Sequence, residues 1–342
     1  MQWGRFITGC LIGCCVTGTA WAQQPKAYRH LLRVYEDNDN INIRGVGTDQ
    51  GYTNGSRIDY FFIKDKPSRF FLDRIMPKAG DSSLNTWGWG LMQVIMTPKN
   101  IIKRIPDKND FPYAGALFAT HTLHSTNSIK KYNIQTEFMF GVMGPPSLAK
   151  QTQRTAHRIV RIVQPGGWDY QLKTDPLLNM SVAGEKELVH INNSIEFIGG
   201  AQGFAGTALN GASLYSLIRI GRMTPYFDGY GSQFATPKGT RQRKQFYFIL
   251  RPSVEWVLYN ALIDGGVFNH SHEPVPGQPN DPNNDEPKKD PMVRKRFVAK
   301  LDYGMALSLG RVCLSFTQTT MTPMVKGTDI QEVGNVSVFL AW

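Results

Sequence analysis

The chain has 342 residues, of which 41% are hydrophobic and 11% aromatic, and its formal net charge is +11. No segment beyond the start of the chain contains the roughly 20 consecutive apolar residues that cross a bilayer as a helix, which excludes a helical membrane protein. Cys10, Cys14 and Cys15 lie near the start, so Cys313 stands alone in the remainder, and a domain held together by disulfides is excluded as well.

The N-terminal residues have the pattern of an export signal. Arg5 precedes a weakly apolar stretch without charges, and the motif A-W-A at residues 20–22 places small residues on either side of a cleavage position. We expect residues 1–22 to be a signal peptide and residues 23–342 to form the mature protein. The motif L-I-G-C at residues 11–14 also resembles the cleavage site of a bacterial lipoprotein, and this alternative stays open.

Alternating polar and apolar residues recur through the rest of the chain, which is the pattern of strands that have two different faces. The clearest case is residues 245–258. Gln245, Arg251, Ser253 and Glu255 would share one face. The opposite face would carry the even-numbered apolar residues Phe246, Phe248, Leu250, Val254, Trp256 and Leu258. Similar segments are expected at 57–63 and 133–142, and a further pair at 298–303 and 305–316.

The end of the chain suggests how these strands are used. Val336, Val338, Leu340 and Trp342 put an apolar residue at every second position and an aromatic one last, which resembles the terminal strand by which outer-membrane barrels are recognised for assembly. One such segment fits a soluble β-sandwich equally well. Counting the segments gives about 10 to 14 strands, and bacterial barrels use even numbers, so we predict an all-β, antiparallel transmembrane β-barrel of about 12 strands. The basic surface favours anionic partners, and in an exported barrel these are phosphorylated lipids rather than nucleic acid.

Two segments interrupt the strand pattern. Residues 264–291 are rich in proline, asparagine and aspartate, and we expect a long extracellular loop there. Residues 147–163 follow two prolines and end before P-G-G at residues 165–167, which predicts one short helix with Ser147 as a possible N-cap.

The predicted helix carries a candidate site. Gln153 and His157 are four residues apart and would share one helix face, next to a basic face with Arg154, Arg158 and Arg161. A solvated helix with an incidental histidine is the alternative.

A second candidate site lies near the start of the mature chain. Residues 36–40 read E-D-N-D-N, and their oxygen ligands suit calcium better than a transition metal. Only two or three of them could converge on one ion, because neighbouring residues of a strand face opposite ways. A turn rich in Asp and Asn is the alternative, and Asn42 in place of glycine does not fit a helix-loop-helix calcium loop.

In combination, these motifs resemble the outer-membrane lipid A 3'-O-deacylase (LpxR-like) family. Five motifs follow one another in the order of that family: N-D-x-apolar at 38–41, T-D-x-x-Y-T-N-G at 48–55, D-F-P-Y-A-G at 110–115, Q-x-x-x-H at 153–157 and G-W-D-x-Q-L at 167–172. The C-terminal half resembles the family only as barrel strands.

The resemblance implies a site between the barrel wall and a short helix near the outer leaflet of the outer membrane. It assigns the catalytic histidine to His157, and further site residues to Gln153, Asn38, Asp39, Thr53 and Lys103. It also implies Ca²⁺, for which the expected ligands are Asp39, Asp37, Gly51, Tyr52 and Thr53. Some family members have a glutamate six residues after the histidine, whereas this chain has Val163.

The function expected from the resemblance is calcium-dependent hydrolysis of the 3'-O-linked acyl or acyloxyacyl chain of lipid A, by a monomer in the bacterial outer membrane. His157 would act as a general base on water. An outer-membrane phospholipase with a serine nucleophile is the alternative enzyme, although the chain has no G-x-S-x-G motif and Ser56 reads as a strand residue. A passive porin-like barrel is the alternative from another class.

Overall fold

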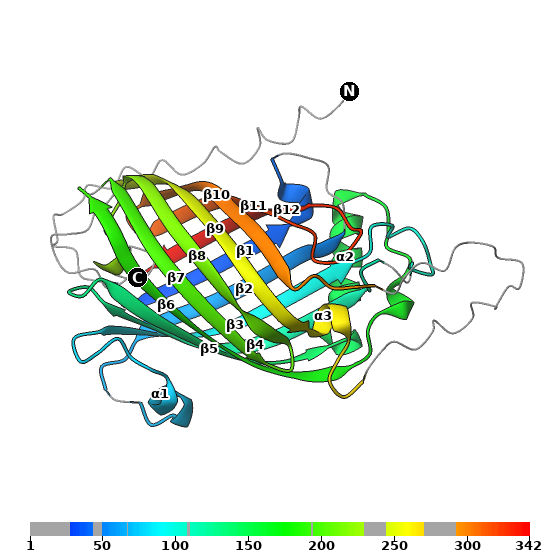
Figure 1. Cartoon of the computed structure of the whole chain (residues 1–342), viewed down its shortest axis with the longest axis horizontal. Helices are drawn as coiled ribbons and strands as arrows, with labels where there is room; N and C mark the ends of the chain where they lie inside the picture. The colour runs from blue at the N-terminus through cyan, green and yellow to red at the C-terminus, as the bar shows by residue number, and fades with distance from the viewer. Residues whose placement is uncertain are drawn as a thin grey trace, which may run out of the picture.

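The computed structural model describes residues 28–43, 50–66, 68–107, 110–192, 194–228, 244–269 and 292–342. Within these residues, twelve antiparallel strands form a closed barrel (Figure 1), which confirms the predicted fold class. The strands are β1 (His30–Asn38), β2 (Gly51–Ile63), β3 (Leu84–Thr97), β4 (Ala114–Asn127), β5 (Tyr132–Met143), β6 (Asp175–Ile191), β7 (Ile195–Gly206), β8 (Leu209–Arg222), β9 (Lys244–Asn260), β10 (Phe297–Leu309), β11 (Val312–Met321) and β12 (Gln331–Ala341).

Each strand pairs with its neighbour in sequence, and β1 pairs with β12 to close the sheet. The backbone N–H groups of Arg29 and His30 both donate to the carbonyl of Trp342, at 3.0 Å, so the two ends of the described chain meet at one rim. We call this rim the terminal end and the opposite rim the distal end. The signal peptide expected at residues 1–22 lies outside the described residues.

Short helical segments occupy the connections between strands. They are η1 (Asp39–Ile41), α1 (Phe71–Ile75), η2 (Pro145–Ser147), α2 (Ala149–Val160), η3 (Trp168–Tyr170), η4 (Tyr226–Asp228) and α3 (Ala261–Asp264). None of the helices in the described part of the chain is long and apolar enough to cross a membrane.

The predicted alternation of β9 is confirmed. Phe246, Phe248 and Trp256 are between 45% and 52% exposed and point away from the barrel axis, whereas Gln245 is buried. Strand lengths run from 9 residues in β1 to 17 in β6, and about 9 to 11 tilted residues suffice to cross the apolar part of a bilayer.

Three sequence expectations about boundaries need correction. The stretch 305–316 is not one strand, because β10 continues to Leu309 and a turn with Gly310 at φ +63° precedes β11. Ser147 does not cap α2: its hydroxyl donates to the carbonyl of Gly144 at 2.6 Å, and Leu148, in a left-handed conformation, is the N-cap residue. The expected loop at 264–291 begins inside α3, and residues 270–291 lie outside the described part.

Charged side chains fill part of the barrel interior. The Arg57 guanidinium pairs with Asp59 at 2.8 Å and with Glu137 at 2.7 Å, and Arg33 pairs with Asp59 at 2.6 Å. Buried charges of this kind are stable only when they are paired. These ion pairs therefore fix which faces of β1, β2 and β5 point into the lumen.

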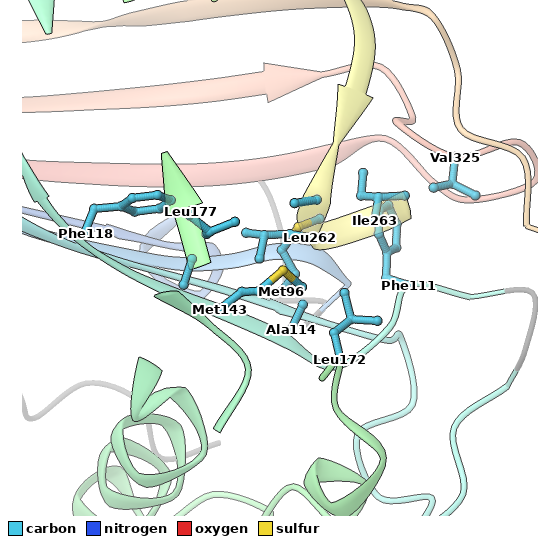
Figure 2. Packing of buried hydrophobic residues seen from close by; sticks show 12 residues of the cluster. Met96, Phe111, Ala114, Phe118, Met143, Leu172, Leu177, Leu262, Ile263 and Val325 are labelled. Carbon is cyan, nitrogen blue, oxygen red and sulfur yellow. The ribbon is translucent and has the colours of Figure 1, made fainter. Parts of the chain in front are cut away.

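Toward the distal end the interior becomes apolar. Figure 2 shows Leu262 and Ile263 of α3 packed with Met96, Phe111 and Leu177, which come from other elements around the barrel. The short helix α3 therefore lies across the distal part of the lumen.

Two other segments lie on the outer side of the wall at the distal end. Met92, Val94 and Met96 of β3 line the interior, so Gln93 and Ile95 face outward. The Gln93 amide donates to the carbonyl of Ser147 at 2.7 Å, which places the start of α2 on the outer wall over β3 and β4. The segment η1 lies over the outer face of β12, since a side chain on Gly334 would collide with the backbone of Ile41.

Candidate active site

The helix α2 is held against the barrel wall by a close approach of two backbones. A Cβ on Gly115 of β4 would lie 2.6 Å from the Ser147 hydroxyl and nearer still to the Cβ of Ala149. Ala149 packs in a buried cluster with Ile95 and Trp168. The last glycine of the motif D-F-P-Y-A-G is thus the residue that admits α2 to the wall.

The end of α2 turns the chain back along the helix. Arg161 adopts a left-handed conformation at φ +59°, and the N–H of Ile162 donates to the carbonyl of His157 at 3.0 Å. This αL cap satisfies carbonyls that the last turn of a helix leaves unpaired. As a result, Val163 lies beside the side chain of His157.

His157 is held in one tautomer. Its imidazole is 5% exposed, and Nδ1 lies 2.6 Å from the carbonyl oxygen of Val163. A carbonyl can only accept a hydrogen bond, so Nδ1 carries the proton in the neutral ring and the lone pair is on Nε2. The backbone of Val163 thus orients the imidazole.

Gln153 lies one helical turn before His157 on the same buried face, as predicted, and is 4% exposed. Its side-chain oxygen accepts a hydrogen bond from the indole nitrogen of Trp168 at 2.7 Å. Trp168 begins η3 and belongs to the motif G-W-D-x-Q-L.

The loops around α2 form one packed unit. The ring centroids of Tyr113 and Trp168 lie 5.0 Å apart, and the Tyr113 hydroxyl donates to the carbonyl of Ile101 at 3.0 Å. The N–H of Gly166 donates to the same carbonyl at 2.8 Å. This packing connects the loop after β3 to the chain that follows α2.

Lys103, which the resemblance assigns to the site, lies in this loop. Its ammonium group pairs with Asp107 at 2.9 Å and is about half exposed. The side chain of Lys103 is thus paired with Asp107 at the surface of this loop.

At the surface, Lys150 of α2 pairs with Asp169 of η3 at 2.6 Å. The hydrogen bond and charge of Lys150 lower the pKa of the Asp169 carboxyl. Arg158 and Arg161 are exposed on the outer side of the same helix, which gives this part of the surface a basic character.

The acidic cluster of β1 is divided between the two faces of the wall. Asp37 faces the lumen, where the Tyr52 hydroxyl donates to it at 2.8 Å and the Asn335 amide also donates. Glu36 faces outward, where it accepts from the Ser56 hydroxyl at 2.6 Å and from the Asn54 amide. The side chains of Asp37 and Tyr52 are thus separated by the wall from the outer side, where α2 lies.

Thr53 occupies a β-bulge between β2 and β3, where the register shifts between Tyr52 and Asn54. Its hydroxyl lies 2.7 Å from that of Thr97, at the distal end of β3. A bulge re-aims a side chain next to a functional site. Thr53 and the start of α2 thus both lie against outward-facing residues of β3, Thr97 and Gln93.

Asn38 and Asp39 lie at the turn from β1 into η1. The side-chain oxygen of Asn38 accepts from the N–H of Asn40 at 2.8 Å and so begins η1. Asp39 is 2% exposed, and its carboxylate accepts from the Asn40 amide at 3.2 Å. These residues are on the outer side of the wall, beside β12.

The histidine and the Asn-Asp pair, far apart in sequence, therefore lie on the outer face of the same end of the barrel. The strands β12, β1, β2 and β3 are consecutive neighbours, and a strand spacing of about 4.8 Å puts the segments that cover β12 and β3 about 14 Å apart. The outward side chains of β1, β2 and β3 lie between these two segments.

The donor set on the outer side suits a hard cation. Asp39 offers a carboxylate, and the carbonyl of Gly51 and the hydroxyl of Thr53 add neutral oxygens, which lie 3.4 Å from each other. Oxygen ligands of this kind fit Ca²⁺. Asp37 and the Tyr52 phenol do not fit as ligands there, because they face the lumen.

One group of acidic and histidine side chains in the described part of the chain has metal-ligand geometry, and it is remote from this region. Glu187, His190 and Glu196 have ligand atoms within 4.8 Å of one another. They lie at the terminal end, and Glu196 is paired with Arg219 at 2.6 Å. This group is not part of the candidate active site.

Comparisons with known proteins agree with the motifs. A family model described as outer membrane protein LpxR matches residues 7–342. The chain belongs to the LpxR family. It is therefore a protein of the bacterial outer membrane, and the family resemblance read from the five motifs is confirmed.

One solved structure supports the fold. LpxR from Salmonella typhimurium superposes with a TM-score of 0.69 at 14% identity, covering 91% of this chain and 100% of that one. The β domain of the Bordetella autotransporter BrkA gives a TM-score of 0.46 at 8% identity, covering 93% of this chain and 100% of that one. A search of curated protein sequences gives no match.

Two of the groups that hold the site together could not be found as functional residues from the sequence. Trp168 was visible only as part of a family motif, and nothing in the sequence connected its indole to Gln153. The acceptor on His157 is a backbone carbonyl, which every residue has, so the identity of residue 163 carries no signal for it.

Proposed function

We propose that this LpxR family member is a hydrolase that removes an ester-linked acyl chain from lipid A, with His157 as the general base. The observation that carries the proposal is the locked tautomer of His157, whose Nδ1–H is held by the Val163 carbonyl on the outer wall of the barrel. A base in this place meets the lipid of the outer leaflet rather than the contents of the lumen.

The reaction is ester hydrolysis. Nε2 of His157 takes a proton from water as the water oxygen attacks the acyl carbonyl carbon. The resulting tetrahedral species expels the sugar oxygen, which receives the proton from the imidazolium, and the products are a free fatty acid and a lipid A hydroxyl group. A histidine suits both transfers because its ordinary pKa lies near physiological pH.

Calcium is part of the proposal. Asp39, the carbonyl of Gly51 and Thr53 would hold the ion, and bound calcium would polarise the ester carbonyl and stabilise negative charge on its oxygen. Asn38 fixes the turn that presents Asp39.

Anionic lipid A would be attracted by the basic outer side of α2, where Lys103 and the arginines offer partners for phosphate groups. Lys103 would have to leave Asp107 to reach a phosphate, and exposed ion pairs of this kind are weak. All the side chains in this scheme come from one chain, so a monomer suffices. Cleavage at the 3' position is taken from the family resemblance.

The alternatives have less support. Ser56, the serine nearest to the site motifs, donates its hydrogen bond to Glu36 at 2.6 Å, which is not the histidine partner that a serine nucleophile needs. A passive pore gives His157 and Gln153 no role. The ion pairs of Arg57 also fill part of the lumen through which a pore would conduct.

The proposal is tested with purified protein in vesicles that contain lipid A and phospholipid together. We expect the wild-type protein to release fatty acid from lipid A in the presence of Ca²⁺ and to leave the phospholipid intact. His157→Gln should lower kcat by about 10² to 10⁴, the usual contribution of a general base. The matched control is His190→Gln, at the terminal end, which should keep wild-type activity. Release from phospholipid instead, or an active His157→Gln variant, would refute the proposal.

A further inference from the structure

Gln153 has a buried donor that no group in the described part of the chain accepts. Its side-chain nitrogen Nε2 has less than 1 Å² of exposed surface and no hydrogen-bond partner there. Its oxygen, by contrast, accepts from the Trp168 indole at 2.7 Å. Buried amide groups in proteins are nearly always paired, so an unpaired one beside a candidate general base calls for a ligand.

The orientation of this amide is set by Trp168. An indole nitrogen can only donate, so it must face the oxygen of Gln153 and not the nitrogen. The amide plane is then fixed, and both N–H bonds of Gln153 are turned away from Trp168. Without that contact, the amide could rotate by half a turn and present its oxygen in the same place.

The indole itself is held rigidly. Trp168 is fully buried among Ile95, Tyr113 and Ala149, and these residues come from β3, the segment before β4 and α2. The position of Trp168 therefore follows from the same packing that holds α2 on the wall.

We propose that Trp168 is a positioning residue that orients Gln153, so that the amide N–H of Gln153 donates a hydrogen bond to the ester carbonyl oxygen as it gains negative charge. This inference rests on the proposed function and deepens it, because it assigns a donor to the reacting ester beside His157. Gln153 and His157 share one buried helix face, so the donor and the base lie on the same side of α2. A donor aimed in advance at an oxyanion stabilises the transition state more than the ground state.

The proposal predicts a specific kinetic signature. Trp168→Phe keeps an aromatic ring in the cluster but removes the indole N–H. We expect it to lower kcat by about 10² to 10³, the range for loss of one oxyanion donor, with KM changed little. Gln153→Met, which keeps the length of the side chain, should cause a similar loss. The double variant should be no worse than Gln153→Met alone, because both changes remove the same interaction.

Tyr113→Phe is the matched control. It removes a hydrogen bond from an aromatic residue in the same cluster, the one to the Ile101 carbonyl, without touching Gln153. It should retain most of the wild-type kcat. If Tyr113→Phe loses as much kcat as Trp168→Phe, general packing and not orientation of the amide explains the effect, and the inference is wrong.

A second measurement is independent of activity. The ¹⁵N–¹H resonance of the Trp168 indole, assigned by its loss in Trp168→Phe, should move when Gln153→Met removes the acceptor. An unmoved resonance overturns the orientation of Gln153. A wild-type protein that does not hydrolyse lipid A contradicts the proposed function instead, whereas an active wild type with a fully active Trp168→Phe contradicts only this inference.

Discussion

Gly115→Ala tests how the barrel wall positions the site. The added methyl group would lie 2.6 Å from the Ser147 hydroxyl and closer to the Cβ of Ala149, where ordinary contact begins at 3.4 Å. The start of α2 would therefore have to move outward by more than about 0.8 Å, the difference between these two distances, because the contact with Ala149 is closer still. Overpacking of this kind costs about 1 to 3 kcal/mol, which the closed sheet can absorb while α2 shifts.

The expected consequence is loss of activity without loss of the barrel. A misplacement of about 1 Å lowers catalysis by up to about 10²-fold, so kcat toward lipid A should fall by one to two orders of magnitude. Urea unfolding in vesicles, followed by tryptophan fluorescence, measures the stability. Gly184→Ala is the control, because nothing lies within 4 Å of its added Cβ. Wild-type kcat in Gly115→Ala would refute the claim that contact with β4 sets the position of α2.

Three further predictions concern the metal, the lumen and the terminal end. Removal of Ca²⁺ with a chelator should abolish lipid A hydrolysis, and Asp39→Asn should raise the calcium concentration needed for half-maximal activity; activity that ignores calcium in both cases would exclude the ion. Glu196→Gln leaves the Arg219 guanidinium buried without its charge partner, so the free energy of unfolding should drop by about 3 to 5 kcal/mol, and a drop below about 1 kcal/mol would contradict the importance of the pair. Burial, the largest single influence, would raise the pKa of Asp73, but the hydrogen bonds from Lys64, Ser68 and His121 and the charge of Lys64 together outweigh it, and the pKa is lowered. The resulting stability is present above the pKa of the unfolded carboxyl, about 3.9, and is lost as the pH falls through the folded value; an Asp73→Asn variant should lack this part of the pH dependence of urea unfolding.

The barrel could be predicted from the sequence because its signal is local and repeated. In β9, the even-numbered residues Phe246 to Leu258 are apolar, and the structure exposes them on the outer face. A period of two needs no knowledge of distant residues. The turn between β10 and β11 is marked only by a change of phase, because the exposed apolar residues are odd-numbered up to Leu309 and even-numbered from Val312.

The site could be predicted only in part, because it depends on which face of each strand points outward and on the local backbone conformation. The motifs predict the site residues and predict both Asp37 and Asp39 as ligands, whereas the structure turns Asp37 into the lumen toward Tyr52. A strand alternates its faces, and the sequence does not say which face is inside when both carry polar residues. The hydrogen-bond acceptor for His157 is the carbonyl of Val163, which the left-handed conformation of Arg161 brings beside the imidazole. An arginine at this position does not predict that conformation.

The central claim is that His157, on the outer wall, does the chemistry on lipid A. The most direct test is the mass of lipid A extracted from the outer membranes of cells that produce the wild-type protein or His157→Gln at equal levels. We predict that lipid A from wild-type cells loses the mass of one acyl or acyloxyacyl chain and that lipid A from His157→Gln cells keeps its full mass. An identical loss in both would contradict the claim.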